Sequence, residues 1–358
     1  MLTNHCYQGD CRDVMRSLIA DGVRVQCIVT SPPYWGLRDY GVDGQLGLEA
    51  SLPQFLANMV EVFDLCHELL ADSGTLWLNM GDSYAGTRGA AWGPSPAATE
   101  ARAMTASRRR DDTPIPRNDV RVEGLKPKDL VGQPWRLAFA LQDAGWWLRQ
   151  DIIWHKPNPM PESVRDRCTK AHEYLFLLTK SEKYFYDQAA VLEPVSANTH
   201  ARLSQDVQSQ IGSTRANGGA KTNGNMKAVG RKVYPGTGVG FGRGYDAEPK
   251  ARVKNNASFD EAMAIMPTER NRRSVWTIPT QSYSGAHFAT FPEALVEPCI
   301  LAGSRVSDIV FDPFMGSGTV ASVAQRLGRR WLGAELNPEY IALQAERTRQ
   351  SGLMLEPC

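Results

Sequence analysis

The sequence predicts an α/β protein in which short buried strands alternate with amphipathic helices. Two observations predict this class. Short apolar runs are followed by segments with helical periodicity, and a glycine turn near residue 316 joins an apolar run to a helix. The chain has 358 residues with ordinary apolar content and charge, so it is long enough for one large α/β domain with insertions or for two domains.

The first 82 residues carry the clearest alternation of strands and helices. The expected elements are a strand at Cys6–Gln8, a helix at Cys11–Ile19, a strand at Val25–Val29, a helix at Leu52–Leu70 and a strand at Thr75–Asn79. Ser73-Gly74 is expected to stop the longer helix. The buried face of that helix is expected to be one apolar stripe, made of Phe55, Leu56, Met59, Val60, Phe63, Cys66 and Leu70.

Regular structure is expected again from about residue 126. A helix at about Asp129–Asp143, closed by Gly145, precedes strands at Trp146–Trp154 and Tyr174–Leu178. The expected elements of the last part are a helix at Pro292–Leu301, a strand at Asp308–Phe311, a helix at Gly318–Leu327, a strand at Arg330–Gly333 and a helix at Pro338–Arg349.

Two segments lack this periodicity and are basic. Residues 83–125 contain Arg108-Arg109-Arg110, and ten glycines fall between Gly212 and Gly244 in the zone 190–275. Residues 201–275 hold 13 Lys and Arg against six Asp and Glu, and residues 101–128 hold eight against four, although the net charge of the whole chain is only +1. These segments are either solvated loops or places where a polyanion binds.

Composition excludes several classes of protein. No apolar run approaches the ~20 residues that a membrane-spanning helix needs, and the amino terminus lacks the apolar core of a signal peptide. The seven cysteines are scattered without a CxxC pair, which argues against a zinc site and predicts no metal. We expect reduced thiols and a cytoplasmic location.

The strand at Val25–Val29 runs into an unusual turn, Thr30-Ser31-Pro32-Pro33-Tyr34. Two prolines make this turn stiff and leave its carbonyl groups outside any helix. The Ser31 hydroxyl and the Pro32 carbonyl form a rigid pair of acceptors beside an aromatic ring, which suits a planar base with an exocyclic amino group. The alternative is a surface turn in which Tyr34 caps the core.

A second motif, Asp312-Pro313-Phe314-Met315-Gly316-Ser317-Gly318-Thr319, joins a strand to a helix as nucleotide pockets do. It lacks the Lys-Ser/Thr of a phosphate loop and the third glycine of a dinucleotide fingerprint. Asp312 could receive an ammonium group, and Glu335, at the end of the next strand, could bridge two ribose hydroxyls. This combination favours S-adenosylmethionine over NAD or ATP. The alternative is a tight turn with no ligand.

Together the two motifs resemble those of the β-class amino-methylating DNA methyltransferases, which methylate cytosine N4 or adenine N6. The resemblance implies a Rossmann-like, S-adenosylmethionine-dependent sheet that is circularly permuted, with the catalytic turn before the cofactor glycines and an inserted target-recognition region. The implied domains are two parts of the catalytic core at 1–82 and 126–189, a mobile basic insertion at 83–125, a DNA-binding target-recognition region at 190–275 and a cofactor-binding half at 276–358.

The resemblance also implies roles for single residues. Ser31 and the Pro32 carbonyl accept the amino hydrogens, with Pro33 in the same turn, and Tyr34 stacks on the flipped base. The implied cofactor residues are Asp10, His287, Phe288, Asp312, Phe314, Gly316, Ser317, Gly318, Thr319 and Glu335. Trp35 and Arg38-Asp39-Tyr40 could order over the flipped nucleotide, and the stretch Asp151–Lys180 is expected to line the base pocket. Arg272 and Arg273 are expected to hold DNA phosphates.

The implied reaction is a direct displacement without a covalent intermediate. Methylation at cytosine C5 would need a cysteine nucleophile after the cofactor glycines, and Pro298-Cys299 and Pro357-Cys358 both look structural. Serine at position 31 resembles the cytosine-N4 subgroup, so N4 is favoured over adenine N6. Two further interpretations are a DNA-binding protein without activity and an enzyme that acts on RNA or a protein amide.

The expected partner is double-stranded DNA. The resemblance leaves open a homodimer and a cognate restriction endonuclease, and it implies a bacterial or phage-encoded protein associated with the nucleoid.

Overall fold

The computed structural model describes residues 3–37, 40–86, 124–195, 268–281 and 291–349. The chain divides into two compact units, the first made of Met1–Val191 and Arg272–Cys358, and the second of Leu192–Asn271. In the second unit, β6 (Glu193–Pro194) pairs antiparallel with β7 (Glu269–Arg270), and Arg270 and Glu193 form an ion pair of 2.9 Å.

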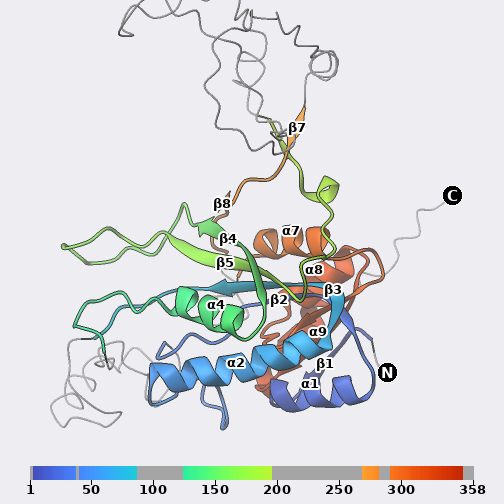
Figure 1. Cartoon of the computed structure of the whole chain (residues 1–358), viewed down its shortest axis with the longest axis horizontal. Coiled ribbons are helices and arrows are strands. Elements are labelled where there is room, and N and C mark those ends of the chain that lie inside the picture. The colour runs from blue at the N-terminus through green and yellow to red at the C-terminus, as the bar shows by residue number, and fades with distance from the viewer. Residues whose placement is uncertain (1–2, 38–39, 87–123, 196–267, 282–290, 350–358) are drawn as a thin grey trace, which may run out of the picture. The chain divides into compact units, whose positions relative to one another are not determined.

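The described part of the first unit is built on an eight-stranded sheet with the order β1-β10-β9-β2-β3-β5-β4-β8 (Figure 1). The strands are β1 (His5–Gln8), β10 (Arg330–Glu335), β9 (Ile309–Asp312), β2 (Val25–Thr30), β3 (Leu70–Met80), β5 (His172–Thr179), β4 (Trp147–His155) and β8 (Val275–Thr277). The first five in this order are mutually parallel, β5 runs antiparallel to both β3 and β4, and β8 is parallel to β4. The carboxyl ends of seven strands and the amino end of β5 therefore share one edge.

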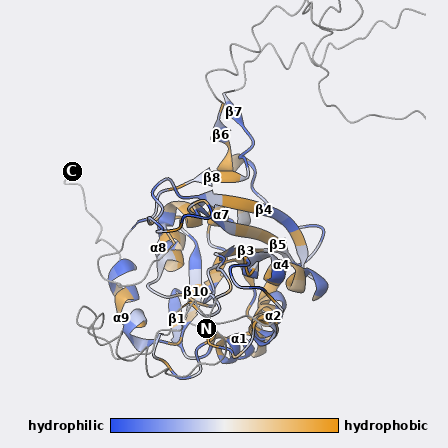
Figure 2. Ribbon diagram, turned by 90° about the vertical axis from the view of Figure 1, so that its left-hand side faces the viewer, coloured by the Kyte–Doolittle hydropathy of each residue, from blue (hydrophilic) through white to orange (hydrophobic). Residues whose placement is uncertain are grey.

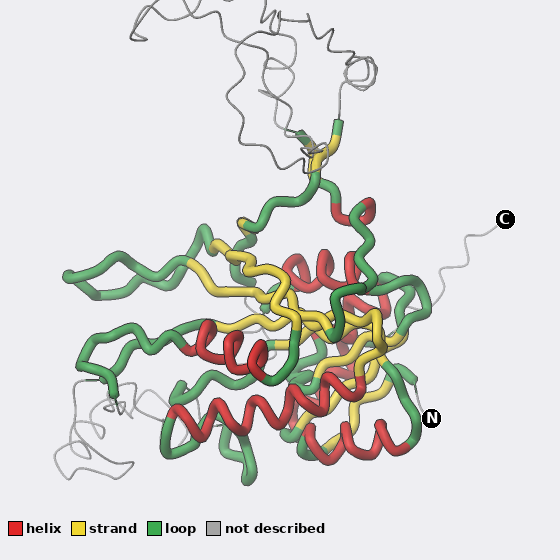
Figure 3. Tube along the Cα trace, in the orientation of Figure 1, coloured by secondary structure: helices red, strands yellow, loops and turns green. Residues whose placement is uncertain are grey.

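Helices cover both faces of this sheet (Figures 1 and 3). One face carries α1 (Cys11–Ala20), α2 (Leu52–Leu69) and α4 (Gln133–Asp143), and the other carries α7 (Glu293–Gly303) and α8 (Thr319–Arg326), with α9 (Pro338–Arg347) beside α8. Figure 3 also shows the loop between β4 and β5 projecting away from the sheet.

Alternation along the strands supplies the two cores. In β3, Leu76 and Leu78 pack against α2, whereas Trp77 packs on the opposite face with residues of α7 such as Leu295. Phe55 on α2 is completely buried in the first core. Figure 2 shows hydrophobic residues gathered on the sheet and on the helices that cover it.

The structure confirms the expected helices and strands and corrects some of their ends. Helix α2 ends at Leu69, before Ser73-Gly74, because Leu70 already pairs with Val25 as the first residue of β3. Val62 and Leu69 are buried, whereas Leu56 and Val60 of the expected stripe are only partly buried.

The first irregular zone begins later in the chain than expected, and the second contains short strands that the sequence did not indicate. Ser83–Ala85 remain in the core because Ala85 is buried and exchanges backbone hydrogen bonds with Lys128 and Asp129. That pairing delays the start of α4 to Gln133. The zone 190–275 contains β6, β7 and the first residue of β8, a strand that is too short to show a period in the sequence. Residues 87–123 and 196–267 lie outside the described residues.

None of the helices that the structure describes is long and apolar enough to span a bilayer.

Candidate functional site

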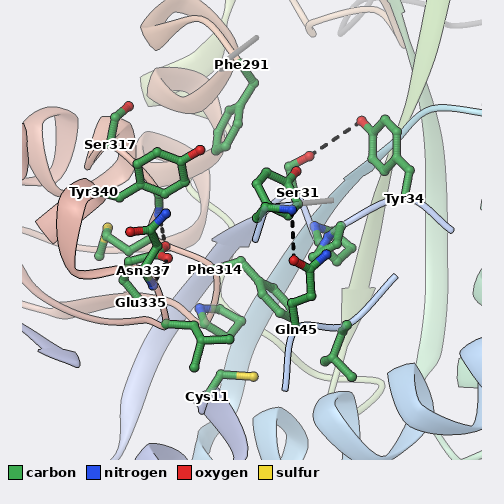
Figure 4. Close-up of a pocket in the computed structure, with 18 of the residues that line it drawn as sticks. Cys11, Ser31, Tyr34, Gln45, Phe291, Phe314, Ser317, Glu335, Asn337 and Tyr340 are labelled. Carbon is green, nitrogen blue, oxygen red and sulfur yellow. Dashed lines mark hydrogen bonds between the residues drawn. The ribbon is translucent and has the colours of Figure 1, made fainter. Parts of the chain in front are cut away.

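A cavity of about 340 Å³ opens at the edge of the sheet where the parallel strands end. This edge is where ligands bind in open α/β sheets, and the volume lies within the range of small-molecule sites. The wall of the cavity joins the turn after β2 to the loops after β1, β9 and β10 and to the facing ends of β4 and β5. In Figure 4, Phe314 lies between Glu335 on one side and Tyr34 on the other. Two motifs separated by about 280 residues thus share one pocket.

The four residues Ser31, Pro32, Pro33 and Tyr34 all line this pocket. The Ser31 Oγ atom lies 3.5 Å from the Tyr34 hydroxyl (Figure 4). The Tyr34 hydroxyl donates a hydrogen bond of 3.0 Å to Glu173 Oε2. Burial, and then the negative charge of Glu173, raise the pKa of Tyr34 well above its ordinary value. The hydroxyl therefore stays protonated and acts as a donor to Glu173.

Glycine at position 81 leaves room for this tyrosine. A Cβ atom at Gly81 would lie 2.8 Å from the Tyr34 ring, closer than atoms in proteins pack. A side chain at this position would therefore displace the ring from the pocket wall.

Glu173 is the centre of a polar cluster that the motifs did not indicate. Its carboxylate accepts hydrogen bonds from Tyr34, from Asn79 Nδ2 at 3.3 Å and from Lys156 Nζ. The Lys156 ammonium also lies 4.3 Å from the centre of the Trp154 ring. Trp154, Lys156 and Glu173 line the pocket, so the stretch Asp151–Lys180 does contribute to its wall as expected.

At the other end of the pocket, Glu335 organises the loop between β9 and α8, residues 313–318, which we call the glycine loop. Its carboxylate accepts backbone hydrogen bonds from Gly316 N at 2.8 Å and from Asn337 N at 2.7 Å. Burial raises the pKa of Glu335, and the two backbone donors act in the opposite direction. Gly316 has a φ of +50°, which favours glycine. Asn337 and Tyr340, which the sequence did not indicate, also line this end.

The loop before α8 is fixed from behind by α9. Arg347 donates to the hydroxyl groups of Ser317 and Thr319 at 2.7 and 2.8 Å, and Gln344 donates to the Gly316 carbonyl at 2.6 Å. Phe314, Gly316, Ser317 and Thr319 line the pocket. Gly318 does not line it, because it lies at the start of α8 with a φ of +85° and packs against Gln344.

The position of Asp312 differs from the one that we expected. We expected it to receive a ligand's ammonium group, but it is fully buried and is not part of the pocket wall. Its Oδ1 atom accepts hydrogen bonds from Thr30 Oγ1 at 2.7 Å and from Phe314 N at 2.9 Å, whereas its Oδ2 atom has no partner among the described residues. Since Thr30 precedes Ser31, Asp312 connects the turn at Ser31 to the glycine loop.

This burial makes stability depend on pH. Burial raises the pKa of Asp312 from 3.8 to about 7, so the native state binds this proton more tightly than the unfolded chain. The free energy of unfolding should therefore fall as the pH rises from about 4 to about 7, by up to ~4 kcal/mol at 1.36 kcal/mol per pKa unit. Asp312→Asn keeps an acceptor for Thr30 and Phe314 but cannot ionise.

We expect the free energy of unfolding of the wild type, measured in urea, to fall relative to that of Asp312→Asn as the pH rises from 5 to 8. A difference between the two proteins that does not change with pH would contradict this assignment.

Asp10 lies at the start of α1 and lines the pocket. The guanidinium of Arg12 lies 2.6 Å from its carboxylate, and this hydrogen bond lowers the pKa of Asp10. The backbone N of Arg12 also donates to Asp10 Oδ1 at 2.8 Å, and the Arg12 guanidinium lies 3.4 Å from Glu61.

Of the remaining residues for which the sequence suggested a role, Tyr40 lines the pocket, whereas the others do not line it or lie outside the described residues. Trp35 was expected over a flipped nucleotide, but it is buried in the core and its Nε1 atom donates to the Glu49 carbonyl at 2.9 Å. Arg272 and Arg273 do not line the pocket, and Arg272 stacks 4.5 Å from the centre of the Trp276 ring. Arg38, His287 and Phe288 lie outside the described residues.

Comparison with known proteins decides the family. The model of the DNA methylase family of N6 and N4 methyltransferases matches residues 25–347. The chain belongs to this family. It is 44% identical over 342 residues to the type II methyltransferase M.Cfr9I of Citrobacter freundii, covering 95% of this chain and 86% of that protein. It is 42% identical over 339 residues to M.SmaI of Serratia marcescens, covering 95% and 88%.

A solved structure agrees with the fold of this DNA methylase. The PvuII cytosine-N4-specific DNA methyltransferase matches with a TM-score of 0.55 at 16% identity, over 97% of this chain and 87% of that one. The family and the fold were thus both expected correctly from the two motifs. The circular permutation and the roles of single residues stay predictions.

Proposed function

We propose that this DNA methylase transfers a methyl group from S-adenosylmethionine to the exocyclic amino group of a flipped DNA base, with cytosine N4 as the favoured target. One observation carries this proposal: the Ser31 turn and the Glu335–Gly316 loop line a single cavity. A methyl donor bound at the Glu335 end would therefore share this cavity with an amino group held by Ser31.

The residues present fit S-adenosylmethionine. Glu335 accepts two backbone hydrogen bonds, and each carboxylate oxygen keeps a lone pair for a ribose hydroxyl. Phe314 and Tyr340 offer apolar surface to an adenine ring, and the half-buried Asp10 carboxylate offers an acceptor nearby. The cofactor supplies an activated methyl group on a cationic sulfur.

The protein contributes alignment and electrostatics. The Ser31 hydroxyl and the Pro32 carbonyl accept the two amino hydrogens, which leaves the nitrogen lone pair directed at the methyl group. The Tyr34 ring packs on the base once it has left the double helix. No residue forms a covalent intermediate in this displacement, and Cys299 is buried in α7 and does not line the pocket.

Cytosine N4 is favoured because residue 31 is serine, as in the N4 subgroup that the motif resembles. Adenine N6 is the second candidate, since the two acceptors at Ser31 and Pro32 suit either amino group. The test is transfer of labelled methyl groups from S-adenosylmethionine to mixed-sequence duplex DNA, followed by nucleoside analysis. We expect the label in N4-methylcytosine. If the label appears only in N6-methyladenine, the choice of cytosine as the target base is wrong. If a protein that binds the cofactor transfers no label, the proposal that DNA is the substrate is wrong.

DNA binding is proposed to involve the basic residues next to β8. Arg273 is exposed, whereas Arg272 is partly buried against Trp276. If Arg273 neutralises one phosphate, Arg273→Gln should reduce the slope of log Kd against log salt concentration by about 1. The measurement is filter binding of duplex DNA at several salt concentrations, with Arg326→Gln on α8 as the control. If the slope does not change, Arg273 does not neutralise a DNA phosphate.

The relatives' names as type II methyltransferases support a place in restriction–modification, in which a partner endonuclease cleaves the unmethylated sequence. A homodimer is a second proposed association.

A further inference from the structure

A chain of polar groups leads from Ser31 through Tyr34 to Glu173. The Ser31 hydroxyl lies 3.5 Å from that of Tyr34, and Tyr34 donates to Glu173 at 3.0 Å. Glu173 also accepts from Asn79 and Lys156. These residues come from the ends of four neighbouring strands, β2, β3, β5 and β4, and all of them line the pocket.

Glu173 determines the direction of every hydrogen bond in this chain. An ionised carboxylate can only accept, and the Lys156 ammonium can only donate. The Tyr34 proton must therefore point at Glu173, so that the Tyr34 oxygen presents a lone pair to Ser31. Ser31 then donates its own proton to Tyr34, and its remaining lone pairs are available to the pocket. A serine that could act as donor or acceptor becomes an acceptor.

The burial of this cluster argues against a merely structural role. The side chains of Lys156 and Glu173 are only 19% and 17% exposed, and desolvating such a pair offsets much of its attraction. Asn79 is buried beside them. An apolar pair of similar size would fill this space without the desolvation cost.

Methylation produces a proton that must leave the pocket. When the amino nitrogen forms its bond to the methyl group, the S–CH₃ bond breaks with its electron pair going to sulfur. The nitrogen then carries one proton too many. This requirement rests on the proposed function.

We propose that Glu173 is a positioning residue that sets Ser31 as the acceptor and receives the product proton through Tyr34. While the bond between nitrogen and the methyl group forms, and in the same step, the amino proton passes to Ser31 Oγ, the Ser31 proton to the Tyr34 oxygen, and the Tyr34 proton to Glu173 Oε2. Each hydroxyl is restored, and only Glu173 gains a proton, which it returns to water after the product leaves. No other reactant is needed.

The test compares Glu173→Gln, Tyr34→Phe and the double variant in single-turnover methyl transfer. The first change replaces a carboxylate that only accepts with an amide that can also donate, and the second keeps the ring without its hydroxyl. We expect each single variant to lose about 10²-fold in rate, with KM for DNA and Kd for S-adenosylmethionine within about threefold of the wild type. The double variant should lose no more than either single variant, because both changes interrupt one chain.

The solvent deuterium isotope effect is the readout that a structural role would not change. The wild type should show a normal effect on the single-turnover rate, and both single variants should lose it. Glu297→Gln is the matched control, since Glu297 pairs with Arg326 on the outer helices and does not line the pocket. If Glu173→Gln does not fold, Tyr34→Phe carries the test, because Glu173 keeps Lys156 and Asn79 in that variant.

Wild-type rates in both single variants, additive losses, or an unchanged isotope effect would each overturn the proposal. A wild-type protein that binds the cofactor but methylates no DNA would overturn the proposed function instead.

Discussion

Replacing Ser31 with alanine is expected to lower the rate of methyl transfer about 10²- to 10³-fold, the usual cost of removing one oriented acceptor or donor from an active site. The change removes a single hydroxyl, which lies 3.5 Å from that of Tyr34. The backbone of the turn is held by Pro32, Pro33 and the Thr30–Asp312 hydrogen bond, so the fold should be unaffected.

The measurement is the single-turnover rate with labelled S-adenosylmethionine, together with the calorimetric Kd of the cofactor. Ser31→Asp is the matched variant, because aspartate can also accept an amino hydrogen, and it should retain more activity than Ser31→Ala. Full turnover in Ser31→Ala would remove Ser31 from the mechanism.

Glu335→Ala is expected to weaken the binding of S-adenosylmethionine about 100-fold. The carboxylate accepts hydrogen bonds from Gly316 N and Asn337 N, and each bond to a charged group contributes about 1.5–3 kcal/mol. Without it, both backbone donors lose their partner and the loop after β9 loses its connection to the end of β10. The change also removes the acceptor that we propose for the ribose hydroxyls.

Calorimetric titration of the cofactor checks this result. Glu335→Gln keeps one of the two acceptor oxygens and should lie between the wild type and Glu335→Ala. Glu339→Ala, an exposed change in the first turn of α9, is the surface control and should bind like the wild type. A Kd for Glu335→Ala within threefold of the wild type would place the cofactor elsewhere.

The sequence indicated those parts of the site that depend on local chemistry. A proline pair after a strand and a glycine turn before a helix are constrained by the backbone alone, so Ser31 and Gly316 could be placed on loops without knowing the fold. The family resemblance then supplied the expectation that both loops serve one pocket.

The rest of the site depends on contacts across the sheet. Glu173 meets Tyr34 only because β5 runs antiparallel beside β3, and no residue near Glu173 in the sequence signals that pairing. Asp312 and Thr30 lie on neighbouring strands, so Asp312 faces a strand rather than the pocket. Trp35 likewise donates to the carbonyl of Glu49, 14 residues further along the same connection between β2 and α2, a contact that no local pattern indicates.

The position of β2 between β3 and β9 has a consequence for synthesis of the chain. Cys27 and Ile28 pair with Val310 and Phe311, so the centre of the sheet is completed only after the ribosome has passed residue 311. Until then β2 has an unpaired edge in a chain that already contains β1 to β5, and such an edge invites aggregation. Pairing across so many residues is also slow. The nascent protein therefore has no assembled pocket, and it can acquire activity only when the last strands have been made.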